Sequence, residues 1–307
     1  MLQNLRYALR QLARSTGFTA VVLAGLLAGT FRARAADAPT DATPLVVARK
    51  LFQAGKYPEA RTALAMIAAT EPVTAEAIFY LGWTAFRQNE NEEAMKLLEQ
   101  ATALDATKSL YFHVLGDTYS IAVQRASIFS KLGWARKCLA AYDRGVALDP
   151  DNLDVRRARC EIYRNAPAIA GGGMDKAYAE AGEIRKRDPL RGAQILGDLY
   201  VSEKKYPEAF ALLDDVIAKN PDNKTLLYQV GRLAAISGQQ LDRGEAALRD
   251  YLQYTPTAND PALYNAHWRL GALFERKGNK AAARAEYEAA LKLSPDYRPA
   301  QDALKKL

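Results

Sequence analysis

The sequence predicts an all-helical fold, a solenoid of about seven stacked helical hairpins. Three kinds of residue recur along the 307 residues and carry this prediction. Two are small residues, one in each helix of a hairpin, and the third is a residue that ends the second helix. The second and third kinds lie 12 residues apart in all seven repeats. Such regularity is typical of repeat architectures.

The small residue of each predicted first helix lets the second helix of the hairpin approach closely. Large residues flank it at helical spacing and fill the space between hairpins. In the seven successive repeats this position holds Ala48, Gly82, Gly116, Ala158, Gly197, Gly231 and Gly271.

The second helix of each hairpin has its own small residue and a predicted end. The small residues are Ala60, Ala94, Cys138, Ala177, Ala209, Gly244 and Ala283. A large residue four positions later is expected to close the hairpin in six repeats, namely Leu64, Leu98, Tyr142, Leu213, Leu248 and Tyr287. The terminating residue is usually proline, which cannot continue a helix. This position holds Pro72, Ala106, Pro150, Pro189, Pro221, Pro256 and Pro295.

These residues resemble the tetratricopeptide repeat family. The likeness is best in LGDLYVSEKKYPEAFALLDDVIAKNPDN (196–223) and LGALFERKGNKAAARAEYEAALKLSPDY (270–297). The resemblance implies a right-handed superhelix of antiparallel helix pairs, whose concave groove is lined by the first helices. We expect this solenoid to span residues 44–297, with a capping helix over 298–307 that covers the last hairpin.

Two repeats are longer than the pattern. The third has extra residues near 120–134, where the apolar residues Ile121, Ile128, Leu132 and Trp134 indicate extended helices. The fourth has an insertion at 165–176, where Pro167 and three glycines break the helix. We interpret it as a connecting loop. Anion binding is the alternative, although the spacing GxxxxGK[ST] of a phosphate-binding loop is missing.

Residues 1–35 have the parts of a secretory signal. They combine a basic start, an apolar stretch over 18–30 and the small-residue site Ala33-Arg34-Ala35. We expect cleavage after Ala35, a linker over 36–43, and an exported protein, periplasmic or secreted, without stable membrane insertion. The alternative is an uncleaved segment that anchors the chain in the inner membrane, although its apolar stretch is shorter than the ~20 residues that a membrane helix needs.

The net charge argues against nucleic acid as a partner. The whole chain carries 42 basic and 35 acidic residues, a net charge of +7. Residues 1–35 contribute five arginines and no acidic residue, so the rest of the chain has a net charge of +2. A polyanion binder would need a larger and more localised excess of positive charge.

The sequence has few residues for catalysis or metal binding. It contains two histidines and two cysteines, and His113 and His267 fall in first helices of different repeats. We therefore predict a non-enzymatic protein without metal or cofactor. Cys138 and Cys160 lie in neighbouring hairpins, so that a disulfide after export and two buried thiols both remain open.

Aromatic residues and arginine dominate the groove positions that the resemblance implies. These residue types are enriched at binding hot spots. The alternative is that several of them pack between adjacent first helices. The predicted partner-binding residues are Arg49, Phe52, Phe79, Trp83, Phe86, Arg87, His113, Arg159, Tyr163, Tyr228, Arg232, Trp268 and Arg276.

The sequence thus predicts a scaffold or adaptor of the bacterial cell envelope that binds a partner protein or peptide in its groove. The alternative function is an enzyme or ligand-binding protein that uses the insertions at 120–134 and 165–176, since loops on a rigid scaffold often carry function. The oligomeric state and the identity of the partner stay open.

Overall fold

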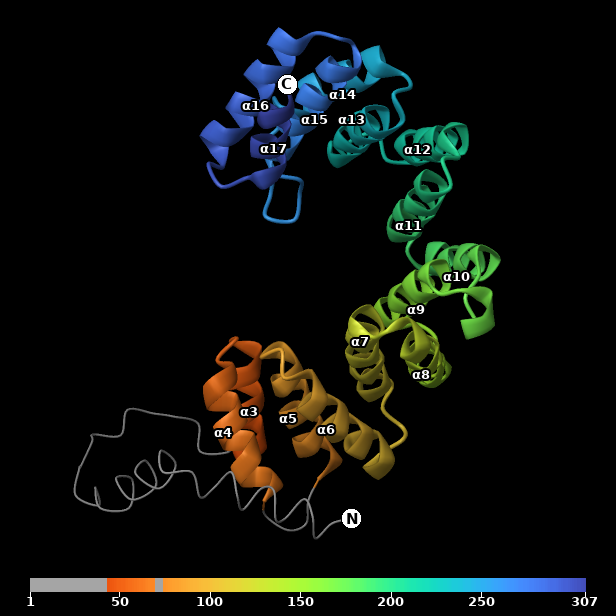
Figure 1. Ribbon diagram of the computed structural model, residues 1–307, viewed down its shortest axis with the longest axis vertical. Helices are drawn as coiled ribbons and strands as arrows, with labels where there is room; N and C mark the ends of the chain where they lie inside the picture. The colour runs from red at the N-terminus through yellow and green to blue at the C-terminus, as the bar shows by residue number, and fades with distance from the viewer. Residues whose placement is uncertain (1–42, 70–73) are drawn as a thin grey trace, which may run out of the picture. The chain divides into compact units, whose positions relative to one another are not determined.

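The computed structural model describes residues 43–69 and 74–307, and all the regular elements in these ranges are helices (Figure 1). The predicted all-helical class is confirmed. No helix in the same ranges is long and apolar enough to cross a membrane. The predicted signal over 1–35 lies outside the described residues.

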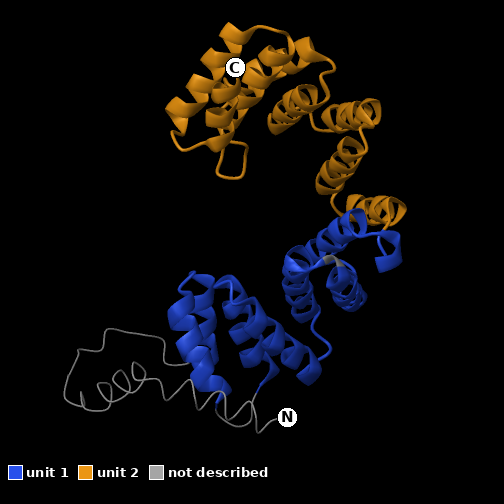
Figure 2. Cartoon of the chain, in the orientation of Figure 1, with its two compact units in different colours: residues 1–172 blue, residues 173–307 orange. Residues whose placement is uncertain are grey.

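The chain divides into two compact units, residues 1–172 and 173–307, coloured separately in Figure 2. The described helices of the first unit are α3 (Pro44–Gln53), α4 (Tyr57–Ala68), α5 (Ala75–Arg87), α6 (Asn91–Leu104), α7 (Ser109–Arg125), α8 (Ile128–Leu148), α9 (Leu153–Asn165) and the 3-10 helix η1 (Ala168–Ala170). Those of the second unit are α10 (Met174–Arg187), α11 (Pro189–Ser202), α12 (Tyr206–Lys219), α13 (Thr225–Ser237), α14 (Leu241–Tyr251), α15 (Leu263–Arg276), α16 (Lys280–Leu293) and α17 (Arg298–Lys306).

Tight turns reverse the chain inside the hairpins. One turn residue adopts a left-handed backbone five positions before the small residue of the second helix. Its φ is 74° at Gly55, 63° at Asn89, 59° at Lys204 and 75° at Gly278. Glycine adopts this conformation without steric cost, whereas Lys204 does so against its intrinsic preference.

Proline marks the ends of several second helices, as predicted. Helices α8, α12 and α16 each end two residues before the proline of their repeat. The joint between α10 and α11 is tighter still, because Asp188 alone separates them. Its backbone N–H bonds to Ile184 at the end of α10, and its side chain accepts a hydrogen bond from the N–H of Arg191 in α11. Pro189 then occupies the first position of α11, where a missing N–H costs nothing.

Both insertions have defined structure. Residues 120–125 belong to α7 and 128–134 to α8, so the third hairpin is lengthened by helix, as the apolar residues indicated. The fourth repeat has the short helix η1 followed by Gly171 at φ 93°. This segment packs on α8, since the guanidinium of Arg136 donates to the carbonyl oxygen of Ile169 over 3.0 Å.

Close contacts between the small residues and the large residues of the second helix hold four hairpins together. A methyl group added to the glycine would lie 2.1 to 3.0 Å from the large side chain in the pairs Gly82 and Leu98, Gly116 and Tyr142, Gly231 and Leu248, and Gly271 and Tyr287. Gly197 is different, because an added methyl group would meet nothing within 4 Å. The close contact that joins a glycine to a large side chain in the other four hairpins is therefore absent between Gly197 and Leu213.

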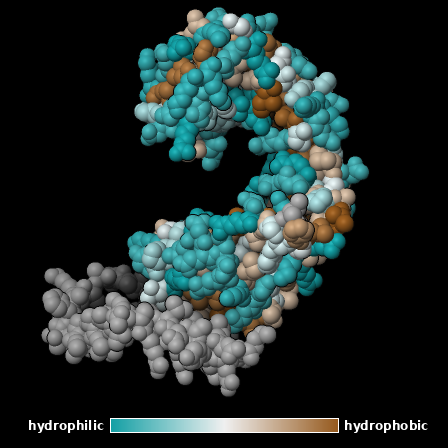
Figure 3. All heavy atoms as spheres, in the orientation of Figure 1, coloured by the Kyte–Doolittle hydropathy of each residue, from teal (hydrophilic) through white to brown (hydrophobic). Residues whose placement is uncertain are grey.

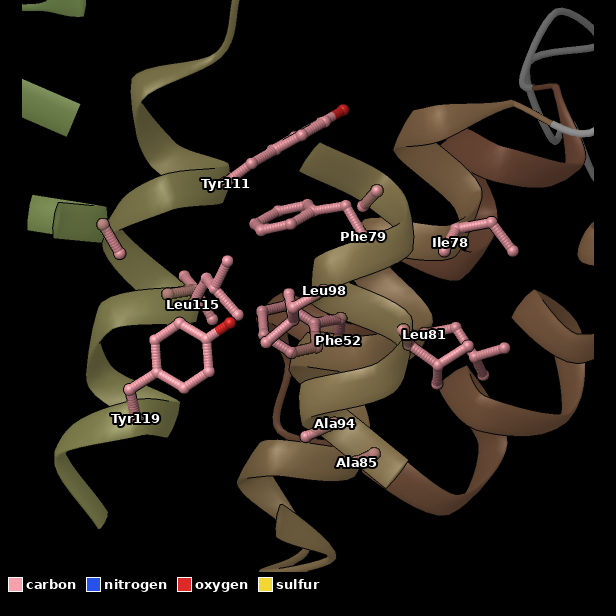
Figure 4. Close-up of a cluster of buried hydrophobic side chains, with 14 of the residues drawn as sticks. Phe52, Ile78, Phe79, Leu81, Ala85, Ala94, Leu98, Tyr111, Leu115 and Tyr119 are labelled. Carbon is pink, nitrogen blue, oxygen red and sulfur yellow. The ribbon is translucent and has the colours of Figure 1, made fainter. Parts of the chain in front are cut away.

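Each unit has its own buried core. In the first unit Phe52, Phe79, Leu98 and Leu115 interlock between the hairpins (Figure 4). In the second unit the largest fully buried side chains include Tyr251 and Tyr287. Burying one large apolar side chain contributes about 1.5 to 3 kcal/mol to stability.

The predicted capping helix closes the second unit. Helix α17 buries Ala300 completely and packs Ala303, Leu304 and Leu307 against the core formed with α15 and α16. Apart from Pro299, its other residues are charged or polar, which suits the solvent-facing side of a terminal helix in a repeat array.

Candidate functional site

Helices α3, α4 and α5 present a cluster of half-buried rings and arginines, which we call the aromatic face: Tyr57, Tyr80 and Trp83 with Arg49 and Arg87. Tyr80, Trp83 and Arg87 are three and four positions apart in α5, so they share one side of the helix. The ring centroids of Tyr80 and Trp83 are 6.0 Å apart. This spacing is within the range of favourable aromatic pairs.

Two predicted binding residues lie beneath the aromatic face instead of on it. Phe52 is 8% exposed and Phe79 is fully buried. The ring of Phe52 lies 4.7 Å from that of Trp83, and Phe79 stacks on Tyr111 of α7 at 4.2 Å. In Figure 4 the rings of Phe79 and Tyr111 lie face to face. Phe52 and Phe79 therefore support the face by packing.

The two arginines of the aromatic face differ in their partners. Arg49 forms an ion pair of 2.9 Å with Glu76, and its guanidinium lies over the Tyr80 ring at 5.5 Å. Arg87 is exposed, and its guanidinium lies over the Tyr57 ring at 5.2 Å. Such cation–π contacts contribute about 0.5 to 1 kcal/mol at exposed sites. Both contacts hold the guanidinium groups close to rings at the surface.

Arg159 and Tyr163 in α9 share one carboxylate. Arg159 donates to Asp143 of α8 over 3.1 Å, and the Tyr163 hydroxyl donates to the same oxygen over 3.3 Å. The guanidinium of Arg159 also lies 5.7 Å from the centre of the Tyr163 ring. The structure therefore brings these two predicted residues together as a pair that joins α9 to α8.

His113 belongs to a polar cluster inside the third hairpin. Its Nε2 lies 3.7 Å from the carboxylate of Asp117, which accepts a hydrogen bond of 2.7 Å from Tyr142. Burial raises the pKa of Asp117 above its usual value, and the nearby His113 opposes this shift. Burial also raises the pKa of the neighbouring Cys138 thiol to about 12. Cys138 is therefore a thiol at neutral pH and a poor nucleophile.

No disulfide joins Cys138 and Cys160, and both are buried. The structure thus has the second of the two alternatives, two buried cysteines that are not joined to each other. Within residues 43–69 and 74–307, no three side chains of histidine, cysteine, aspartate or glutamate are arranged to hold a metal ion.

The predicted residues of the second unit lie at separate places. Tyr228 is 8% exposed and packs against Tyr251 at 5.6 Å. Trp268 is half-buried between Tyr297 and the guanidinium of Arg269, which is 4.0 Å from its ring. Arg276 donates to the carbonyl oxygens of Ala235 and Ile236 over 2.9 and 3.0 Å. These hydrogen bonds satisfy carbonyl groups at the C-terminal end of α13, where the helix dipole makes a positive charge favourable.

Arg232 lies at a cavity of about 410 Å³ between α11, α12 and α13. Its guanidinium pairs with Asp198 of α11 over 2.9 Å. The walls are mainly aliphatic, with Leu212, Leu213 and Val216 from α12 and Leu226 from α13. Figure 3 shows hydrophobic residues, coloured brown, at the surface where α12 and α13 adjoin. The size is in the range of ligand-binding pockets.

Tyr57, Tyr80 and the α12 walls of the cavity were not predicted from the sequence. Tyr80 precedes Leu81 at the anchor of the second repeat, so its place beside Trp83 could have been read from helical spacing alone. The walls of the cavity carry no such signal, because Leu213 occupies the same repeat position as the tightly packed Leu248.

Antiparallel hairpins with small residues at their contacts place the chain among the helical repeat proteins. Two stretches match family models described as tetratricopeptide repeat, residues 47–109 and residues 264–297. The chain therefore contains tetratricopeptide repeats. The matched stretches include the aromatic face and the hairpin of α15 and α16.

One curated relative shares part of the sequence. It is the TPR repeat-containing thioredoxin TTL4 of Arabidopsis thaliana, which is 31% identical over 114 residues, or 37% of this chain. The matched part spans only 15% of the length of that relative.

Solved structures of similar fold cover most of the chain. A tetratricopeptide repeat protein from Parabacteroides merdae matches 85% of this chain and 96% of its own, with a TM-score of 0.60 and 16% identity. The C-terminal part of a TPR repeat-containing protein from Cytophaga hutchinsonii matches 85% of this chain and 99% of its own, with a TM-score of 0.52 and 17% identity. At this level of identity the likeness shows the fold alone.

Proposed function

We propose that the protein is a scaffold or adaptor that binds a segment of a partner protein on the aromatic face. Tetratricopeptide repeat proteins are typically scaffolds for protein interactions, which supports this proposal. The observation that carries it is the aromatic face itself, where half-buried Tyr80 and Trp83 lie beside exposed Arg87 over a rigid layer of buried rings. Aromatic residues and arginine fixed in this way resemble the anchors of binding hot spots.

The ion pairs of the structure refine the kind of partner that fits. Four of the predicted groove residues, Arg49, Arg87, Arg159 and Arg232, offer a positive charge to acidic groups of a partner. Arg49, Arg159 and Arg232 are each paired with a carboxylate of the same unit. We therefore propose that rings and aliphatic groups provide most of the contact area, with Arg87 as the principal site for an acidic group.

Affinity capture with paired variants tests this proposal. The full chain and its Trp83→Ala/Arg87→Ala variant are used to capture partners from an extract of the native compartment. We expect the variant to lose the partner, because truncated hot-spot residues typically cost more than about 1 kcal/mol each. Circular dichroism checks that the variant is folded.

The matched control is Trp134→Ala/Arg125→Ala, which removes the same residue types from the extended hairpin of α7 and α8. It should retain the partner. Equal recovery by the folded Trp83→Ala/Arg87→Ala variant would reject the aromatic face. Loss by the control variant alone would favour the alternative function at the 120–134 insertion.

We also propose that the protein works in the cell envelope, as an exported protein. The basic start, apolar stretch and small-residue site of residues 1–35 support this location. Fractionation of cells that express the full chain, followed by mass spectrometry of its N-terminus, tests it. A new N-terminus at Ala36 in the envelope fraction is expected. An intact Met1 in the cytoplasm would refute export.

A further inference from the structure

The cavity of the second unit exists because one hairpin is splayed. Gly197 of α11 stands at the repeat position where Gly231 and Gly271 meet a large side chain of the second helix. An added methyl group at Gly197 would meet nothing within 4 Å, whereas at Gly231 it would lie 2.1 Å from Leu248. Leu213, which corresponds to Leu248, is half-buried and lines the cavity.

The walls of the cavity are apolar and partly open. Leu212 and Leu213 of α12 are each only half-buried, although both carry large aliphatic side chains in the middle of a helix. Apolar surface that stays in contact with water in this way carries an unfavourable free energy in proportion to its area. A ligand that covers these walls recovers that free energy. The cavity is thus favourable for an apolar group.

The size of the cavity sets the size of that group. An engineered cavity of about 150 Å³ takes up benzene. The present cavity, at about 410 Å³, is more than twice as large. It has room for a two-ring side chain such as that of tryptophan, or for a branched aliphatic side chain together with part of the adjoining backbone.

The polar residues that line the cavity favour neutral polar groups over an anionic head group. Arg232 and Asp198 neutralise each other across 2.9 Å, and the other two charged residues of the lining, Asp188 and Arg191, are also of opposite sign. The amide side chains of Gln194, Asn223 and Gln229 are also part of the lining. Amides can both donate and accept hydrogen bonds, which matches the N–H and C=O groups of a peptide backbone. A fatty acid or a phosphate would instead require an uncompensated cation.

We propose that this cavity receives a bulky apolar side chain of a partner peptide, whose backbone lies against the amide side chains of the lining. This inference rests on the proposed function as a binding scaffold and adds a second anchor point, in the second unit. The occupant is a tryptophan, phenylalanine or leucine side chain next to uncharged backbone. Such a side chain would act as an anchor residue in a desolvated pocket.

Filling the cavity from within tests the proposal. In the variant Gly197→Leu the new side chain projects from a position with open space around it. The matched control is Gly182→Leu in α10, where an added methyl group also meets nothing within 4 Å and which does not line the cavity. Both changes place the same side chain at a helical glycine of the second unit.

The first readout uses indole as a probe and needs no knowledge of the partner. Saturation-transfer NMR on the full chain should show indole bound to the original protein and to Gly182→Leu, and no longer bound to Gly197→Leu. Equal indole signals from all three proteins, or none from the original protein, would overturn the assignment of the cavity.

The second readout uses peptides selected from a random display library on the original full chain. The selected peptides that compete with indole should be rich in tryptophan, phenylalanine or leucine. They should bind Gly197→Leu at least about tenfold more weakly, and Gly182→Leu with unchanged affinity. Selected peptides with equal affinity for all three proteins would overturn the anchor role of the cavity while leaving the scaffold function in place. Indole binding without any selected peptide would overturn the peptide occupant of the cavity, while the scaffold function is tested separately by capture on the aromatic face.

Discussion

Alanine at Gly197 and alanine at Gly231 should change the stability of the second unit in opposite directions. Alanine is favoured over glycine by about 1 kcal/mol inside a helix. At Gly197 the new methyl group meets nothing within 4 Å. The whole propensity gain should therefore appear as increased stability.

At Gly231 the same methyl group would lie 2.1 Å from Cγ of Leu248, which is fully buried. Relief of such a clash requires a shift of packed atoms and typically costs about 1 to 3 kcal/mol. The propensity gain is common to both variants, so their stabilities should differ by about 1 to 3 kcal/mol, with Gly197→Ala the more stable.

Hydrogen exchange measured by mass spectrometry suits this comparison, because repeat arrays do not always unfold in one step. Peptides from α11 to α14 report the local free energy of opening. Gly197→Ala should slow exchange there, and Gly231→Ala should speed it. Equal acceleration by both variants would show that the hairpin of α11 and α12 is as closely packed as its neighbours. The origin that we assign to the cavity would then be incorrect.

Three further perturbations follow from local geometry. Lys204→Gly should stabilise the protein by about 1 kcal/mol, since Lys204 has a left-handed φ of 59°, and urea denaturation measures the change. Arg276→Ala should lower the free energy of unfolding by about 1 kcal/mol, because the carbonyl groups of Ala235 and Ile236 lose their hydrogen-bond donor. Hydrogen exchange at the end of α13 should become faster, and unchanged exchange there would contradict this role. Burial raises the pKa of Cys138 to about 12. In a Cys160→Ser variant, which leaves Cys138 as the one thiol, the reaction with iodoacetamide at pH 8 should be very slow in the folded protein and rapid in urea. Similar rates in both states would disprove the burial of the thiol.

The helices were predictable because their signals are local. Small residues, turn residues and prolines recur at fixed spacing, and each acts on the backbone within a few positions. Helices α8, α12 and α16 accordingly end just before the proline that marks their repeat. The lengthened third hairpin was also predictable from the sequence, because its apolar residues keep helical periodicity up to Arg125 and from Ile128 onward.

How deeply a side chain is buried was less predictable than which side of its helix it occupies. Phe79 and Trp83 are four positions apart on one side of α5, yet Phe79 is fully buried and Trp83 is half-buried. The difference comes from Tyr111 of the next hairpin, which stacks on Phe79. Contacts between repeats depend on how closely neighbouring hairpins pack, and the sequence of a single repeat does not show this.

The splayed hairpin could not have been predicted at all from its own repeat. Gly197, Ala209 and Leu213 satisfy the same pattern as Gly231, Gly244 and Leu248. In the second set the glycine and the leucine are in contact, and in the first set they are not. The separation of α11 from α12 is a property of packing in three dimensions.

The joint at Asp188 limits how the chain can change in length. One residue ends α10 and begins α11, and on the next turn Gly192 sits so close to Arg185 that an added methyl group would lie 2.2 Å from its Cα. Inserting or deleting a residue here would rotate α11 by about 100° relative to α10. Leu199, which is almost fully buried, would swing out of the interior. Length variation among relatives of this chain should therefore accumulate in the glycine-rich segment before α10 and be rare at Asp188.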